Sequence, residues 1–135
     1  MVTIGLVVAR YHQAITERME EMARTAAEER GATVAETIHV PGAYDTPLAA
    51  DRLARRDDID AVAAMGAIIT GDTDHDQVIA TAAAQGLTDV SLDRDTPVTF
   101  GIAGPGMTAE EAYDRIDYGA SAVESAIDMT EERSA

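Results

Sequence analysis

Hydrophobic and polar residues follow two patterns in turn along this chain. The apolar run at residues 62–69 has the length and composition of a strand buried on both faces. Residues 2–9 form another continuous apolar strand, and a further strand is expected at residues 98–103. Residues 33–40 alternate more regularly, so we expect this strand at an edge of the sheet.

The segments between these runs predict helices. Residues 13–30 carry an apolar stripe at helical spacing, and Gly31 follows as a C-terminal stop. We expect further helices at about 48–56 and 77–85, the second of them ended by Gly86.

A last helix is expected to begin at the G-P-G-M-T sequence of residues 104–108 and to fray at 131–135. Its buried stripe consists of Ala112, Ile116, Gly119, Val123 and Ile127. Strands that alternate with helices predict a three-layer α/β/α sandwich around a four-stranded parallel sheet. We expect one domain that spans residues 1–135.

The chain is strongly acidic, with a net charge of −15, and all 10 of its basic residues are arginine. Such a charge repels nucleic acid and anionic membranes, so neither is an expected partner. The carboxylates are dispersed along the chain, which is typical of a protein from strong brine; an ordinary acidic protein is the alternative. With no membrane-length apolar run, no basic leader and no cysteine, we expect a cytoplasmic protein.

Candidate chemistry gathers where the predicted strands end. Ligands of open parallel sheets bind beyond the carboxyl ends of the strands. Those ends are followed by residues 10–12, 41–45, 70–75 and 100–106. Most of the aromatic residues, Tyr11, Tyr44 and Phe100, fall there, and aromatic faces beside hydrogen-bonding groups suit a planar heterocycle.

The loop that follows residues 62–69 has the composition of an anion site beside a histidine. Gly71 permits a tight turn, and Asp72 or Thr73 can cap the next helix, whose free N–H groups bind anions. His75 lies beside them. The simpler alternative is a capped helix start with a solvated histidine.

Metal binding in this loop is a further alternative. A calcium loop of the EF-hand type is excluded, because it needs Gly and Glu where the chain has Gln77 and Ala83. A metal ion held by His75 with Asp74 or Asp76 stays open.

Five motifs, in order along nearly the whole chain, resemble the 6,7-dimethyl-8-ribityllumazine synthase family, above all its archaeal members. They are A-R-Y-H-Q-A-I-T, V-P-G-A-Y-D-T-P, G-A-I-I-T-G-D-T-D-H-D, P-V-T-F-G-I and G-P-G-M-T-x-x-x-A-x-x-R-x-D-Y-G. The resemblance implies a flavodoxin-like fold and a transferase of riboflavin biosynthesis that needs neither metal nor organic cofactor. Its substrates would be 5-amino-6-(D-ribitylamino)uracil and 3,4-dihydroxy-2-butanone 4-phosphate, and it would release phosphate and water.

The resemblance also implies which residues bind the pyrimidine substrate. The matching positions are Tyr11, Ala43, Tyr44, Asp45, Ala67, Ile68, Ile69 and Phe100. Tyr11 would stack its ring on the pyrimidine, where the family usually has Phe. Asp45 stands in place of the commoner Glu, so its reach toward the ribityl chain is shorter.

A second set of residues would handle phosphate and protons. The matching positions are Asp72, Thr73, His75 and Arg115. His75 would donate the proton, and Arg115 would bind the phosphate of the butanone. The chain differs from the family's usual pattern at two positions. His12 stands where an asparagine is common, and Ala120 stands where many relatives have a lysine.

Self-association is implied as well, into pentamers and, as larger forms, decamers or sixty-subunit icosahedral capsids. The residues that match Phe100 and Arg115 would reach into the neighbour's site, which holds Tyr11 and His75. An alanine-rich third helix also predicts more buried surface than one small sheet needs.

Two alternatives of other classes stay open. A catalytically inactive, shell-forming protein would share the assembly. A flavin-binding flavodoxin-like module would need a hydroxyl-rich phosphate loop after the first strand, where the chain has R-Y-H-Q at residues 10–13.

Overall fold

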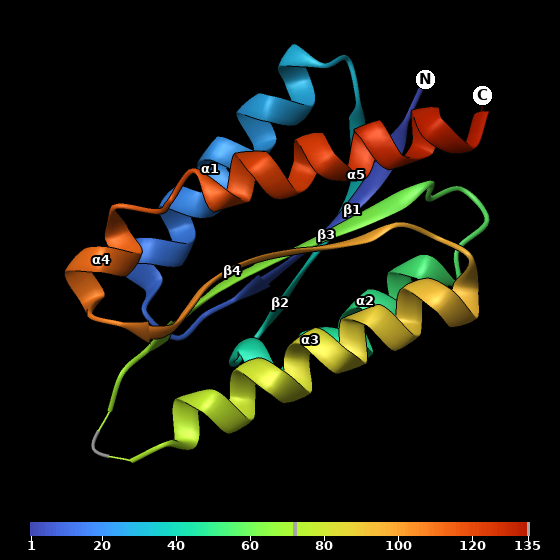
Figure 1. Ribbon diagram of the computed structural model, residues 1–135. Coiled ribbons are helices and arrows are strands. Elements are labelled where there is room, and N and C mark those ends of the chain that lie inside the picture. The colour runs from blue at the N-terminus through green and yellow to red at the C-terminus, as the bar shows by residue number, and fades with distance from the viewer. Residues whose placement is uncertain (72, 135) are drawn as a thin grey trace.

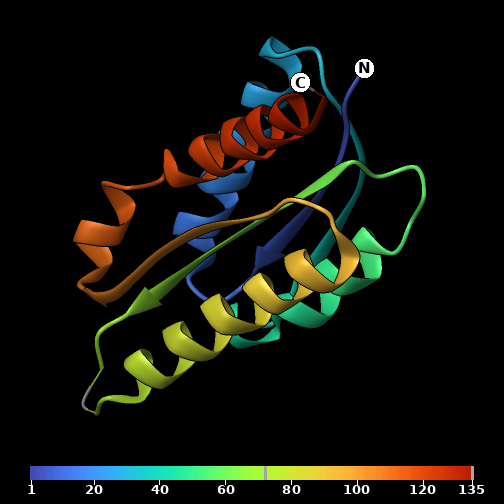
Figure 2. The same cartoon turned by 45° about the vertical axis from the view of Figure 1, so that its right-hand side comes forward.

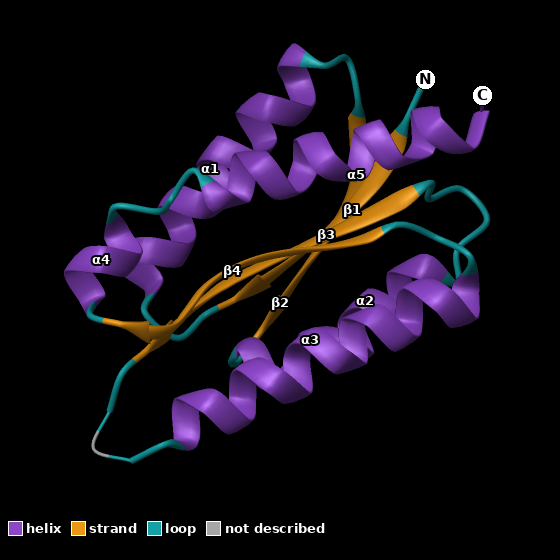
Figure 3. Ribbon diagram, in the orientation of Figure 1, coloured by secondary structure: helices purple, strands orange, loops and turns teal. Residues whose placement is uncertain are grey.

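A parallel sheet forms the centre of the protein, with helices on both faces (Figures 1 and 3). The computed structural model describes residues 1–71 and 73–134. The four strands are β1 (Thr3–Ala9), β2 (Thr33–Val40), β3 (Ala61–Ile69) and β4 (Val98–Met107). Their order, β2-β1-β3-β4, confirms the predicted fold class and places β2 at an edge as expected.

The helices divide between the two faces of the sheet. They are α1 (Gln13–Glu29), the 3-10 helix η1 (Ala43–Asp45), α2 (Thr46–Ala54), α3 (His75–Arg94), α4 (Ala109–Tyr113) and α5 (Tyr118–Ser134). Helices α1 and α5 cover one face, and α2 and α3 cover the other (Figure 2). No helix among the described residues is long and apolar enough to cross a membrane.

Each face of the sheet carries its own layer of core. In β1, Leu6 and Val8 pack under α1 and α5, whereas Val7 and Ala9 pack under α2 and α3. This alternation follows from the two-residue period of a strand. Strand β3 lies between two neighbours and is buried from Ala61 to Ile68, as its continuous apolar pattern predicts.

Helix α3 is longer than the sequence pattern predicted. It begins at His75 and continues through Gly86 to Arg94, so the prediction that Gly86 ends it is wrong. Gly86 serves packing instead, because a Cβ atom there would lie 2.7 Å from Cγ of Pro47. Its lack of a side chain lets α2 and α3 approach closely. A glycine inside a helix makes that helix less stable than an alanine would, by about 1 kcal/mol.

Strand β4 also extends further than predicted. It continues through Met107, so residues 104–108 do not begin the last helix. Thr108 caps α4: its Oγ1 accepts the Glu111 N–H (3.2 Å), and Glu111 Oε1 accepts the Thr108 N–H (3.0 Å).

Turns over residues 114–117 then separate α4 from α5, so the one predicted helix is two. The predicted stripe still holds across this break, with four members buried and Ile116 half-buried. Helix α5 runs to Ser134, past the point where fraying was expected, and residue 135 lies outside the described residues.

Candidate functional site

A cavity of ≈ 300 Å³ lies at the carboxyl ends of β1, β2 and β3. This rim lies at the opposite end of the sheet from both chain termini (Figure 1). Seven of the lining residues were predicted from the sequence: Tyr11, Ala43, Ala67, Ile68, Ile69, Thr73 and His75. The structure therefore brings together residues from three separate strand ends.

Tyr11 forms the aromatic wall of this cavity. Its ring rests on Gly42, where a Cβ atom would lie 2.7 Å from Cδ2 of the ring. The Tyr11 N–H donates to the carbonyl of Pro41 (3.0 Å), which ties the end of β1 to the end of β2. Because the side chain is 66% exposed, this backbone-supported ring keeps a surface on which a planar ligand can stack.

His12 follows Tyr11 and also lines the cavity. Its backbone is left-handed (φ 65°, ψ 53°), and its carbonyl accepts the N–H groups of Ile15 (2.9 Å) and Thr16 (3.1 Å). This conformation is uncommon outside glycine, and histidine is among the residues that adopt it more readily. The sharp turn from β1 into α1 thus places His12 beside the aromatic wall.

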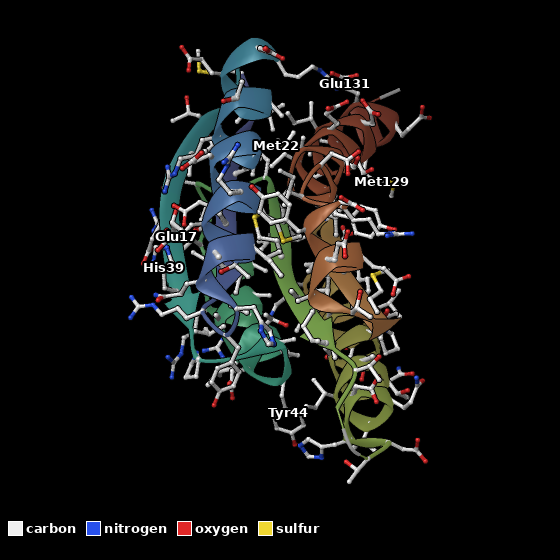
Figure 4. All side chains as sticks on the ribbon, turned by 90° about the vertical axis from the view of Figure 1, so that its left-hand side faces the viewer. Glu17, Met22, His39, Tyr44, Met129 and Glu131 are labelled. Atoms are coloured by element: carbon white, nitrogen blue, oxygen red, sulfur yellow. The ribbon has the colours of Figure 1, made fainter. Side chains whose placement is uncertain are left out.

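The segment after β2 contributes through η1. Ala43 is buried and lines the cavity, whereas Tyr44 and Asp45 are exposed and do not line it. Figure 4 shows Tyr44 extending away from η1 at the end of the molecule where the strands finish. Asp45 Oδ2 accepts the Gly42 N–H (3.0 Å), so this carboxylate holds the η1 turn.

The end of β3 and the start of α3 form the rest of the wall. Ala67 and Ile68 are buried, and Ile69 is half-buried. Asp72, the predicted phosphate contact and candidate cap, lies outside the described residues. Asp74 occupies the N-cap position without a side-chain bond, and Thr73 Oγ1 accepts the His75 N–H (3.2 Å).

His75 is exposed at the first position of α3 and borders the cavity. No hydrogen bond from its ring to another described residue is present, so the ring can face a ligand. Among residues 1–71 and 73–134, no three His, Asp or Glu side chains gather closely enough to hold a metal ion. Asp76 instead accepts the N–H of Gly106 (3.2 Å), an arrangement that the sequence did not indicate.

Phe100 lies away from this cavity. It pairs with Ala64 near the start of β4, so the prediction that it stands at a carboxyl end is wrong, because β4 continues to Met107. Phe100 is 44% exposed on the free edge of the sheet. There it borders a second cavity of ≈ 390 Å³, together with Tyr118 and Ser121 of α5.

Arg115 lies outside the cavity too, in the turn between α4 and α5. One guanidinium nitrogen donates to the carbonyl of Glu111 (2.8 Å). In the part of the chain that the structure describes, no carboxylate forms an ion pair with Arg115. Its remaining N–H donors are therefore available to an anion.

Comparison with known proteins gives matches over nearly the whole chain. The family model described as 6,7-dimethyl-8-ribityllumazine synthase matches residues 1–134. A protein of that name from Halobacterium salinarum is 65% identical over 132 residues, which cover 98% of this chain and 99% of the relative. Its counterpart in Halorubrum lacusprofundi is also 65% identical, with 98% of both chains covered. The Methanocaldococcus jannaschii counterpart is 47% identical, with 96% of this chain and 92% of the relative covered.

Proposed function

The chain belongs to the 6,7-dimethyl-8-ribityllumazine synthase family, and we propose that its reaction takes place in the cavity at the carboxyl rim of the sheet. The enzyme is a transferase of riboflavin biosynthesis. It condenses 5-amino-6-(D-ribitylamino)uracil with 3,4-dihydroxy-2-butanone 4-phosphate and releases phosphate and water. The observation that carries the proposed site is the convergence of Tyr11, the end of β3 and His75 on one cavity.

The cavity offers what the pyrimidine requires. The ring of Tyr11 would cover one face of the heterocycle, and the backbone of residues 67–69 would meet its polar edge. Ala43 keeps the floor small and apolar beside them. Such orientation of two reactants can contribute roughly 7–11 kcal/mol in favourable cases.

Proton transfer is the main chemical demand of the reaction. The arylamine attacks the ketone, water leaves to give an imine, phosphate is eliminated, and ring closure releases a second water. A side chain that can both donate and accept a proton serves these steps best, and the imidazole of His75 has this capacity beside Thr73 at the start of α3. We assign it the role of proton donor.

The phosphate of the butanone needs a cation that one chain does not place there. No arginine lines the cavity in the described part of the chain. We therefore propose that Arg115 of a neighbouring subunit completes the site beside Thr73, and that Phe100 of the same neighbour supplies the second ring contact. Both residues lie outside the cavity of their own chain, as a site between two subunits requires.

Exposed uncharged surface supports assembly of several copies. Residues 77–88 of α3 carry no charged side chain, although the whole chain has a net charge of −15. On the same helix, Val78 is 62% and Leu92 is 75% exposed. Because a bare apolar face is unfavourable in water, we propose that copies form a pentamer, the unit from which any decamer or capsid would be built.

The acidic surface fits a cytoplasmic enzyme of a halophilic cell that acts as one domain over residues 1–135. Its dispersed carboxylates and the 65% identity to the Halobacterium and Halorubrum proteins support this setting.

Turnover with the two substrates tests the function directly. In concentrated potassium chloride, the purified protein should release phosphate and form the fluorescent lumazine only when both substrates are present. Tight binding of riboflavin without turnover would instead favour the flavin-binding alternative. Assembly without turnover or flavin binding would favour an inactive shell protein.

A further inference from the structure

We propose that Asp76 is a positioning residue that holds the loop of Thr73 and His75 against the end of β4, an inference that rests on the function proposed above. The role follows from how the side chain of Asp76 is buried and from the atom that it contacts.

Asp76 is buried to an unusual degree for a carboxylate near a helix start. It is 8% exposed, whereas its neighbours His75 and Gln77 are both exposed. Among the described residues, it is the one buried side chain that carries a carboxylate. Burial of such a group is unfavourable unless it is hydrogen-bonded, and its Oδ2 accepts the Gly106 N–H at 3.2 Å.

This bond is one of two that connect Thr70 and Asp76 to adjacent residues of β4. At one end, the Thr70 N–H donates to the carbonyl of Met107 (2.8 Å). At the other end, Asp76 accepts from Gly106, the residue before Met107. Thr73 and His75 therefore lie between two residues, Thr70 and Asp76, that are each hydrogen-bonded to β4.

Gly106 is suited to its part in this arrangement. Its φ of +77° is favourable for glycine and strained for other residues, and nothing lies within 4 Å of the place where a Cβ atom would be. The backbone conformation, and not a lack of space, thus accounts for glycine at the position that donates to Asp76.

Loss of the bond would free the first turn of α3, and with it the ring of His75. A proton donor acts only within hydrogen-bond reach of its target, so a small displacement lowers turnover. The pyrimidine subsite would be spared, because Tyr11 and Ala43 lie on other elements. We therefore expect a lower kcat and a higher KM for the butanone phosphate, with the KM for the pyrimidine unchanged.

Three variants test this role. Asp76→Ala should lower kcat about 10-fold and raise the KM for the butanone phosphate, with the KM for the pyrimidine unchanged. Asp76→Asn keeps an acceptor oxygen and should recover most of kcat. Asp74→Ala is the matched control, because Asp74 is an exposed carboxylate two positions away without a side-chain capping bond, and it should stay within about twofold of wild type.

Equal kinetics of Asp76→Ala and Asp74→Ala would overturn the proposal, as would failure of Asp76→Asn to exceed Asp76→Ala. A rise of the KM values for both substrates would indicate that the whole site is disturbed, and this result would also overturn the proposal.

Amide hydrogen exchange of the wild-type protein tests the bond without a variant, in case Asp76→Ala does not fold. The Gly106 amide should be protected although Gly106 is exposed, and rapid exchange there would contradict the proposal. This readout does not depend on turnover. Failure of the wild type to form lumazine would thus count against the proposed function, and an unprotected Gly106 against the role of Asp76.

Discussion

Gly119 of α5 lies directly against the backbone of Met19 in α1. A Cβ atom on Gly119 would stand 2.2 Å from the carbonyl oxygen of Met19, well inside contact distance. The two helices that cover this face of the sheet are therefore joined at a point where only glycine fits. Figure 4 shows the same pair of helices with Met22 of α1 between them.

Replacement of Gly119 by alanine should destabilise the protein. The added methyl group must push α5 away from α1, and such overpacking typically costs about 1–3 kcal/mol. Denaturant unfolding would measure this loss. Gly71→Ala is the control, because nothing lies within 4 Å of its Cβ position. Equal unfolding midpoints for the two variants would show that the helices can separate freely.

A second prediction concerns Asp51, which accepts hydrogen bonds from Arg94 (Nε, 2.8 Å) and from Arg55. The bond from Arg94, followed by that from Arg55, lowers the pKa of Asp51 from 3.8 to about 2. A carboxylate whose pKa is lower in the folded state stabilises the fold above its unfolded pKa. This contribution is lost as the pH falls from about 4 to about 2.

Asp51→Asn should therefore unfold more easily than wild type near neutral pH, and the difference should shrink across that acidic window. Denaturant unfolding at several pH values and one fixed salt concentration measures it. Asp57→Asn, at an exposed carboxylate nearby, is the control for the loss of one charge. A difference between Asp51→Asn and wild type that stays constant down to pH 2 would contradict the role of the arginines.

Tyr11 should act through its ring face and not through its hydroxyl. Tyr11→Phe should leave the KM for the pyrimidine nearly unchanged, whereas Tyr11→Ala should raise it by the loss of a stacking contact worth roughly 0.5–1.5 kcal/mol. Steady-state kinetics with the butanone phosphate saturating would separate the two variants. A large defect in Tyr11→Phe would show that the hydroxyl itself binds the substrate.

Salt should stabilise the folded protein. With a net charge of −15, carboxylates repel one another across the surface, and salt shortens the range of this repulsion from about 10 Å at 0.1 M to about 3 Å at 1 M. The thermal midpoint should therefore rise with potassium chloride over this range. A flat midpoint would remove the inference of a halophilic protein.

The sequence predicted the sheet and most of the cavity because both depend on local pattern. Continuous apolar runs identified β1 and β3, and strand ends of a parallel sheet necessarily share one rim. Tyr11, Ala43 and His75 could thus be placed together from their positions in the chain.

The misplaced features depend on contacts between distant residues. Gly86 resembles a helix stop in the sequence, but it lies inside α3 and its missing side chain leaves room for Pro47 of the neighbouring helix. The length of β4 depends on its pairing with β3, which continues to the pair of Met107 and Ile69. The carboxyl end of β4 is therefore at Met107, and Phe100 lies near the other end of the strand. The bond from Gly106 to Asp76 joins residues 30 positions apart, and no periodicity signals it.

Two subunits should complete each site, since Arg115 and Phe100 lie outside the cavity that holds Tyr11 and His75. His75→Ala and Arg115→Ala should each have strongly reduced turnover, because one lacks the proton donor and the other the phosphate contact. The His75→Ala chain still carries an intact Arg115, and the Arg115→Ala chain still carries an intact His75.

Reassembly of these two variants together tests this arrangement most directly. Equal amounts would be unfolded, mixed and refolded in concentrated salt, and the rate of lumazine formation compared with that of the variants refolded separately and then combined. Random mixing in a closed ring makes about one quarter of the sites wild type in both halves, so about one quarter of wild-type activity should return. If mixing restores no activity beyond that of the separate variants, His75 and Arg115 serve one site within a single chain, and the shared site is ruled out.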